Sequence, residues 1–80
     1  ESGRDALALE DYKKVIALEP AYWYAEESAA TVGFRLGLFE EAARRYASVY
    51  AKVPERHEYA ILASIALLKQ GKVKEARELA

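Results

Sequence analysis

Few residues in this sequence have the types and spacing that catalysis requires. His57 is the only histidine, and it lies between charged neighbours at a predicted helix start, where a solvent-facing role is the simpler interpretation. None of the serines has a general base at the spacing of a catalytic motif. Asp5, Asp11 and the scattered glutamates form no cluster with metal-ligand spacing. We therefore predict that the chain is not an enzyme and has no metal site, no cofactor and no small-molecule substrate.

The charge and composition argue against several other classes of binding protein. The chain has 12 basic and 13 acidic residues, a net charge of −1, whereas a nucleic-acid-binding surface normally needs an excess of basic residues on one face. The four glycines form no phosphate-binding loop, because no Gly-rich run follows a predicted strand. No segment approaches the roughly 18 consecutive apolar residues of a membrane span. We predict no nucleic-acid partner and no direct membrane insertion.

The chain is short and has no cysteine. Its 80 residues make one domain, near the lower limit for a hydrophobic core that folds unaided. Without cysteine there is no disulfide framework and no indication of the redox compartment. No targeting pattern occurs in these residues, so the localisation is unknown, with the cytoplasm slightly favoured.

Segment 37–54 contains the helical pattern that recurs in the rest of the sequence. Its apolar residues are Phe39, Ala42, Ala43, Tyr46, Val49, Tyr50 and Val53. Successive apolar residues are three positions or one position apart, which places them on one face of an α-helix and does not fit the alternation of a strand. Gly37 marks the start of this helix, and Pro54 prevents its continuation.

The same pattern occurs three times at a constant spacing of 34 residues. Segment 3–20 matches segment 37–54 at Gly3/Gly37, Ala8/Ala42, Tyr12/Tyr46, Val15/Val49, Ala17/Ala51 and Pro20/Pro54. A third copy begins at Gly71 and places Ala76 in register with Ala42. A fixed period that repeats residues of the same kind indicates an internal repeat.

A 34-residue period with two helices per unit resembles the tetratricopeptide repeat (TPR) family. The matching residues are the small residues Ala8, Ala42 and Ala76, the aromatic residues Tyr12 and Tyr46, the prolines Pro20 and Pro54, the first-helix residues Ala30 and Ser64, and the turn glycines Gly37 and Gly71. The first-helix signature departs from the family pattern. In the first helix of the two copies, Glu26 and Ala60 stand where the family has a tryptophan. Gly33 and Leu67 stand at the tyrosine position, and Ala29 and Ala63 stand at the leucine position.

The resemblance implies an all-α fold over residues 1–80, an α-solenoid of antiparallel helix hairpins. It divides the single domain into the second helix of a preceding repeat (1–20), one complete repeat (21–54) and an incomplete following repeat (55–80). The expected helices are 4–19, 22–36, the helix within 37–54, 56–70, and one that begins after Gly71.

Three smaller expectations follow from this arrangement. Gly33 is expected to pack tightly against an aromatic ring, and the alternative is a bend or a close contact with a ligand. Leu7 and Leu9 are expected to be uncovered, because the helix that should precede theirs is missing. Glu41 and Arg45 are expected to form an i, i+4 ion pair on a solvated helix face.

The predicted helix 56–70 has almost no polar side, which is typical of a helix that is covered all round. Packing within the repeat covers the face that carries Tyr59, Ala60, Ala63, Ala66 and Leu67. It leaves Ile61, Ile65 and Leu68 without a partner, and this remaining apolar stripe is the clearest functional indication in the sequence.

The TPR resemblance implies that the first helices line a concave groove in which partners bind. The groove positions are Tyr24, Glu27, Thr31 and Phe34 in the first copy, and Glu58, Ile61, Ile65 and Leu68 in the second. Their spacing of three, four and three residues is one helical face. One TPR subgroup grips a C-terminal carboxylate with Lys and Asn at such positions, but this chain has Glu27 and Ile61 there and no asparagine.

Three consecutive aromatic residues, Tyr22, Trp23 and Tyr24, stand at a predicted helix start. Neighbours on a helix point about 100° apart, so the three cannot all face one core. One or two of them form a possible second contact, since Trp and Tyr often contribute most of the binding energy at an interface. The alternative is that they cover the exposed end of the preceding helix.

The sequence thus predicts a protein–protein interaction or scaffold module. Its groove would bind an apolar helix or an extended hydrophobic peptide, with Glu27 and Glu58 as polar contacts. The alternative function is structural, with the apolar stripe and the incomplete ends joining copies of the chain into a homo-oligomer. A third candidate is a holder of apolar segments that resembles a secretion chaperone.

Overall fold

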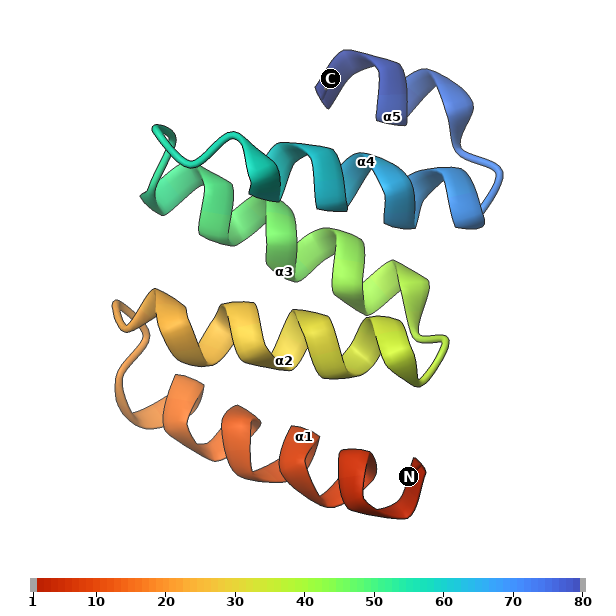
Figure 1. Ribbon diagram of the computed structural model, residues 1–80. Helices are drawn as coiled ribbons and strands as arrows, with labels where there is room; N and C mark the ends of the chain where they lie inside the picture. Colours follow the sequence, from red (N-terminus) through yellow and green to blue (C-terminus); the bar gives the residue numbers. More distant parts are fainter. Residues whose placement is uncertain (1, 80) are drawn as a thin grey trace.

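A computed structural model describes residues 2–79, and within them the protein is entirely helical. The helices are α1 (Ser2–Leu18), α2 (Trp23–Arg35), α3 (Phe39–Lys52), α4 (Glu58–Lys69) and α5 (Val73–Leu79). They stack in chain order, from α1 at one end to α5 at the other, and each packs mainly on its neighbours in sequence (Figure 1). The all-α prediction is confirmed, and the expected helix limits agree with the structure to within about two residues.

The first glycine turn ends α2. Gly37 has φ +82°, a left-handed conformation that residues with a Cβ rarely adopt. Its N–H donates to the Phe34 carbonyl at 3.1 Å, and the N–H of Leu38 donates to the Gly33 carbonyl at 2.8 Å. This pair of bonds is a Schellman motif, which satisfies carbonyls that the end of a helix would otherwise leave free.

The turn that ends α4 repeats this geometry 34 residues later. Gly71 has φ +79°. Its N–H donates to the Leu68 carbonyl at 2.9 Å, and the N–H of Lys72 donates to the Leu67 carbonyl at 2.9 Å. The sequence repeat is therefore also a repeat of backbone conformation and hydrogen bonding.

Small side chains form most of the core. Five alanines are completely buried, namely Ala29, Ala30, Ala42, Ala63 and Ala66, and Val49 is the largest side chain that is completely buried. Two tyrosines provide the bulk that alanine lacks. The rings of Tyr46 on α3 and Tyr59 on α4 lie nearly parallel at 17°, with centroids 6.3 Å apart. Close approach of the helices and this stacked pair hold α3 against α4.

A smaller apolar cluster joins α1 to α2. It contains Leu9, Ala29 and Val32, with Tyr12 and Ile16 packed at its edge. The expectation that Leu9 would be uncovered is wrong, because α2 buries it to 4% exposure.

The expectation that Glu41 and Arg45 lie on a solvated face is also wrong. Arg45 Nε donates to Glu41 at 3.0 Å, as the i, i+4 spacing predicts, but both side chains are largely buried. Arg45 also lies 3.9 Å from Glu26 of α2, and Glu41 lies 3.9 Å from Lys13 of α1. Glu26 continues the network to Lys52 at 2.9 Å. These side chains link three helices.

A further ion pair connects α1 and α2 at the surface. The guanidinium of Arg35 donates to both carboxylate oxygens of Asp5 at 3.1 and 3.2 Å. These hydrogen bonds hold the pKa of Asp5 below its ordinary value. The pair adds a polar contact to the apolar cluster that joins these two helices.

Gly33 does not pack against an aromatic ring, contrary to expectation. It is buried in α2, and the nearest atoms to a Cβ built on it are the Cβ and the carbonyl oxygen of Leu38, both at 3.9 Å. That distance is ordinary van der Waals contact, so the site has room for a methyl group.

The two glycines at and near the end of α2 should respond oppositely to alanine. Gly33→Ala should raise the free energy of unfolding by about 0.5–1 kcal/mol, because alanine restricts the unfolded chain and favours the helix. Gly37→Ala should lower it by about 1–2 kcal/mol, because the positive φ strains any residue with a Cβ. Urea denaturation of both variants measures the difference, and a destabilised Gly33→Ala variant would contradict the space that the structure shows.

Neighbouring alanines on α3 provide a test of the packing. Ala42 is completely buried, so Ala42→Leu should destabilise the fold by about 1–3 kcal/mol through overpacking. Ala43 lines an open cleft, and Ala43→Leu should have a smaller effect because the added atoms extend into it. Thermal melts followed by circular dichroism compare the two variants, and equal melting temperatures would show that the register of α3 is wrong.

Candidate functional site

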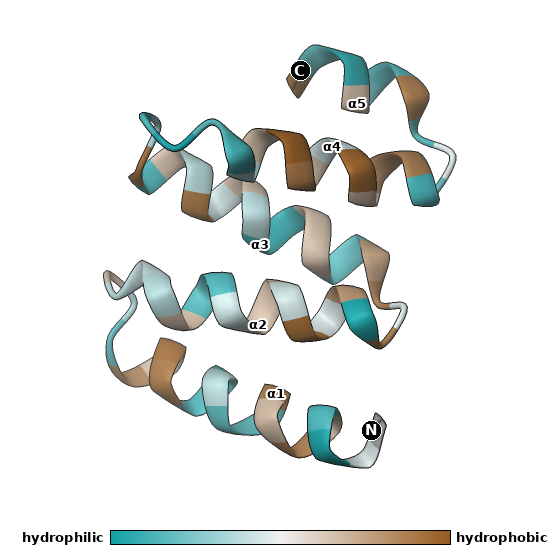
Figure 2. Ribbon diagram, viewed as in Figure 1, coloured by the Kyte–Doolittle hydropathy of each residue, from teal (hydrophilic) through white to brown (hydrophobic). Residues whose placement is uncertain are grey.

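The outward face of α4 carries three aliphatic side chains. Ile61, Ile65 and Leu68 are 57%, 38% and 51% exposed, and their spacing places them on one side of the helix. The buried residues of α4, among them Ala63 and Leu67, lie on other sides. Figure 2 shows that apolar residues occupy much of α4. The expected exposure of this stripe is confirmed.

The corresponding face of α2 is less exposed. Tyr24 is half exposed, whereas Glu27, Thr31 and Phe34 are partly buried. The ring of Phe34 packs against the main core and meets the ring of Phe39 edge-on, with centroids 5.1 Å apart. Phe34 thus contributes to packing between helices, a role that the sequence analysis did not assign to it.

A hydrogen-bonded group of polar side chains lies between α2 and α3. Thr31 Oγ1 lies 2.8 Å from the hydroxyl oxygen of Tyr46 and 3.1 Å from the Glu27 carbonyl, to which it donates. Burial raises the pKa of Tyr46, and the negative charge of Glu27 raises it further, although the bond to Thr31 acts in the opposite direction. Burial and the charge of Glu27 also raise the pKa of Tyr59.

The aromatic residues at the start of α2 form a stacked group. Tyr22 and Tyr24 are exposed and Trp23 is partly buried, so the expectation that one or two lie at the surface is confirmed. Trp23 stacks on Tyr24 with centroids 3.8 Å apart and meets Tyr59 edge-on at 5.9 Å. The guanidinium of Arg56 lies 5.3 Å from the centroid of Trp23, a cation–π contact.

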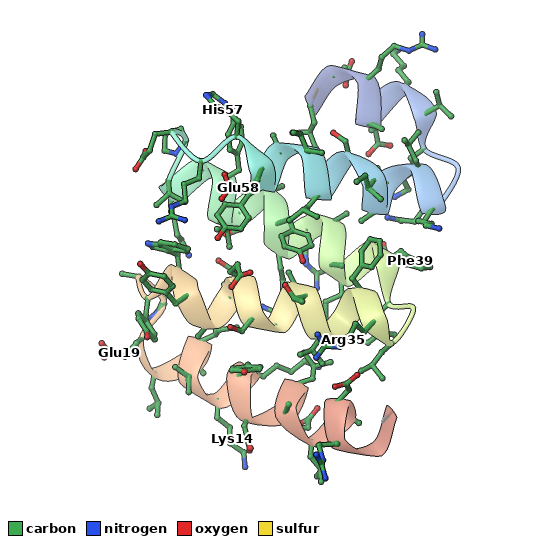
Figure 3. All side chains as sticks on the ribbon, viewed as in Figure 1. Lys14, Glu19, Arg35, Phe39, His57 and Glu58 are labelled. Atoms are coloured by element: carbon green, nitrogen blue, oxygen red, sulfur yellow. The ribbon has the colours of Figure 1, made fainter. Side chains whose placement is uncertain are left out.

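The expected groove residues line separate hollows. Tyr24 and Tyr22 line an apolar hollow of about 140 Å³ beside α1. Glu27 and Thr31 line a polar one of about 220 Å³. Leu68 lines a third, apolar hollow of about 230 Å³ between α4 and α5. The first two hollows lie between α1 and α2, and none of the three contains predicted groove residues from both α2 and α4. Glu58 is exposed at the start of α4, 3.8 Å from Arg56 (Figure 3).

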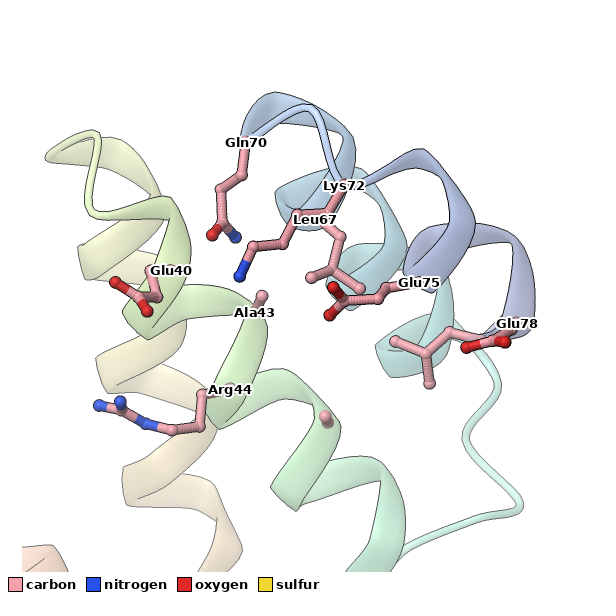
Figure 4. Close-up of a pocket in the computed structure, with 10 residues that line it drawn as sticks. Glu40, Ala43, Arg44, Leu67, Gln70, Lys72, Glu75 and Glu78 are labelled. Atoms are coloured by element: carbon pink, nitrogen blue, oxygen red, sulfur yellow. The ribbon is translucent and has the colours of Figure 1, made fainter.

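The sequence analysis missed a cleft of about 490 Å³ between α3 and α5. Its apolar lining residues are Ala43, Ala47, Leu67 and Leu79. Its charged ones include Glu40 and Arg44 on α3, Lys72 just before α5, and Glu75 and Glu78 on α5 (Figure 4). The small residues Ala43 and Ala47, one helical turn apart, leave this space. That spacing was visible in the sequence, but the position of α5 opposite it was not.

Other features give no indication of chemistry. His57 is exposed and points away from the helix stack (Figure 3). Within residues 2–79 no group of three or more His, Asp or Glu residues is placed to hold a metal ion. None of the helices in this part of the chain has the length and apolar character of a membrane span.

No family model matches the sequence, and neither the curated proteins nor the solved structures include a significant match to it. The resemblance to TPR proteins therefore depends on the residues and their spacing alone.

The raised pKa values of Tyr46 and Tyr59 predict a loss of stability in alkali. Both hydroxyls hold their protons more tightly in the folded state, so their contribution to stability is complete below the unfolded pKa of about 10 and is lost as the pH rises above it. Tyr46→Phe and Tyr59→Phe should each reduce the slope of unfolding free energy against pH. Urea denaturation at pH values from 8 to 11 measures this slope. A slope that stays unchanged in both variants would show that neither hydroxyl is responsible.

Proposed function

We propose that this chain is a protein–protein interaction module built as a TPR-like α-solenoid. The architecture is supported by the 34-residue sequence period and by the two identical Schellman turns at Gly37 and Gly71. It is also supported by the order in which neighbouring helices pack. In this proposal α2 and α3 form the complete repeat, α1 belongs to the preceding repeat, and α4 and α5 to the following one.

The observation that carries the function is the exposed stripe of Ile61, Ile65 and Leu68 on α4. A folded monomer seldom exposes neighbouring large aliphatic side chains without using them. Burial of one such side chain by a partner contributes about 1.5–3 kcal/mol before the costs of association are subtracted. The stripe therefore suits a partner that presents apolar side chains, either on an amphipathic helix or on an extended segment.

Polar groups beside the stripe would set the orientation of that partner. Glu27 is partly buried next to two tyrosines, and Glu58 is exposed at the start of α4. Within residues 2–79 no basic side chain lies within ion-pair distance of Glu27. A hydrogen-bond donor of the partner is the complementary group for this carboxylate, and Tyr24 provides an aromatic surface nearby.

Ile65→Asp should abolish this binding without unfolding the domain. Ile65 lies one turn from both Ile61 and Leu68, so a charge there disrupts the whole stripe. Apolar 12-residue peptides are first selected from a phage-displayed library for binding to the wild-type chain. The measurement is the capture of these peptides by each variant. Leu7→Asp is the control, because Leu7 is an exposed aliphatic side chain on α1, away from the stripe. It should retain the selected peptides.

Circular dichroism and thermal melts accompany the binding measurements. If Ile65→Asp unfolds the chain, Ile65 belongs to the core and the proposed groove is wrong. If the variant folds and captures the same peptides as the wild type, the binding surface lies elsewhere, and Tyr22 and Trp23 are the next residues to test.

Self-assembly is a second candidate, and one observation favours it. The described stack ends at α1 and α5 (Figure 1). Large apolar side chains are exposed near both ends, Leu7 and Leu18 on α1, and Leu68 and Val73 at α4 and α5. Contacts between two different ends are heterologous and extend into rings or filaments. Light scattering over a dilution series separates the candidates, because an interaction module stays monomeric and a self-assembling chain does not.

A further inference from the structure

The cleft between α3 and α5 has an equivalent in the preceding copy of the sequence repeat, between α1 and α3, here called the first position. The residues 34 positions before Ala43 and Ala47 of the cleft are Leu9 and Lys13 on α1. Leu9 is buried in a cluster with residues of α2, and Lys13 lies 3.9 Å from Glu41 of α3. A leucine and a lysine therefore stand at the first position where the cleft has two alanines.

The cleft is open because these alanines replace longer side chains. Ala43 and Ala47 are one helical turn apart on α3, and the cleft that they line has a volume of about 490 Å³. Clefts that bind small molecules usually have volumes of about 300–1,000 Å³. At the first position the longer side chains come from α1, which precedes the helix that carries Glu41. Their counterparts in the cleft are on α3, so the open space results from residues 43 and 47 and does not depend on a helix beyond residue 79.

The replacement of the lysine also changes the surroundings of a carboxylate. Glu75 of α5 is the counterpart of Glu41, which has two basic neighbours, Lys13 at 3.9 Å and Arg45 at 3.0 Å. The counterparts of these two basic residues are an alanine and a leucine, at positions 47 and 79. Within residues 2–79 no basic side chain lies within ion-pair distance of Glu75. The repeat thus retains the glutamate but not its cations.

The carboxylate faces an apolar wall. Figure 4 shows the side chain of Glu75 directed toward α3, whereas Arg44 points away from α5 and the ammonium of Lys72 lies near Gln70. The apolar side chains of the lining are Ala43, Ala47, Leu67 and Leu79. A ligand between α3 and α5 therefore meets aliphatic surface and, beside it, a negative charge.

We propose that the α3–α5 cleft binds an ammonium group on an unbranched aliphatic chain, the chemistry that Lys13 supplies at the first position. The aliphatic chain lies along Ala43 and Ala47, as the stem of a lysine side chain commonly covers apolar surface. The ammonium pairs with the carboxylate of Glu75. The source of this group is the lysine side chain of a partner protein or a free alkylamine. The site is separate from the aliphatic stripe on α4 and does not depend on the function proposed for that stripe.

The first probe is n-hexylamine, which combines an aliphatic chain with an ammonium group. Its binding to the complete chain is followed by amide chemical shifts in proton–nitrogen correlation spectra. Saturable shifts should centre on Ala43, Ala47 and Glu75. The control for the aliphatic chain alone is n-hexanol. It should bind about two- to five-fold more weakly, the difference expected for one solvent-exposed ion pair.

A capped lysine, Nα-acetyl-lysine N-methylamide, separates the two sources of the ammonium group. Its only charge is the side-chain ammonium, which is carried on a peptide backbone. If it produces the same shifts as n-hexylamine, the cleft accepts the lysine of a partner protein. If n-hexylamine binds and the capped lysine does not, the cleft excludes the backbone and the ligand is a free alkylamine.

Variants of the protein locate the site. Ala47→Lys restores the lysine of the first position, so its side chain should fill the cleft beside Glu75 and abolish the shifts caused by n-hexylamine. Ala51→Lys is the matched control, because Ala51 is exposed one turn later on the same helix, and it should bind n-hexylamine as the wild type does. Glu75→Gln keeps the shape of the cleft and should weaken n-hexylamine by about two- to five-fold while leaving n-hexanol unchanged.

Three results would overturn the proposal. They are the absence of saturable shifts at the cleft, equal binding of n-hexylamine and n-hexanol, and binding of n-hexylamine that survives Ala47→Lys. If circular dichroism shows that Ala47→Lys unfolds the chain, Glu75→Gln decides the question, because unchanged binding of n-hexylamine would exclude the ion pair. Ile65→Asp, which tests the proposed function, should leave the binding of n-hexylamine unchanged, so either proposal can fail without the other.

Discussion

The structure depends on the close approach of helices whose contact residues are mostly alanine. Within residues 2–79, five alanines are completely buried, and only one larger side chain, Val49, is buried to the same extent. An alanine removes little apolar area from water, so the helices are stabilised only if their backbones come close. The larger contributions come from Tyr46 and Tyr59, whose stacked rings join α3 to α4. The hydroxyl of Tyr46 also reaches Thr31 on α2, so one side chain connects three helices.

Close packing of this kind requires a fixed register, which the glycine turns provide. The same two hydrogen bonds end α2 and α4, and each turn depends on a glycine with positive φ. Because both turns reverse the chain in the same way, residues at equivalent positions meet equivalent neighbours. Phe34 and Phe39 meet across the first turn, and Leu68 and Val73 line one hollow beside the second. The turns therefore convert a repeat in sequence into a repeat of surfaces.

The sequence predicted features that depend on residues nearby in the chain. It did not predict features that depend on how helices distant in the sequence pack together. Helix limits followed from glycine, proline and apolar spacing, and the burial of Ala42, Tyr46 and Val49 followed from one helical face. The spacing also predicted the pair of Glu41 with Arg45, yet its burial depends on where α1 and α2 cross α3. Leu9 was misjudged because its cover comes from α2. The role of Phe34 in packing likewise needs the position of Phe39.

The internal repeat distinguishes two kinds of position on the exposed part of α4. Some positions are large and apolar in both copies of the repeat, as at Phe34 and Leu68. We infer that such a position contacts the next helix, which both copies require. A position that changes from polar to aliphatic has no such common requirement. Glu27 and Thr31 on α2 correspond to Ile61 and Ile65 on α4. The fold accommodates polar side chains at these two positions, so their replacement by isoleucine on α4 is not explained by packing between helices. Of the exposed stripe, Ile61 and Ile65 are thus the residues that best support the proposed partner surface, whereas Leu68 keeps the large apolar character of its counterpart Phe34.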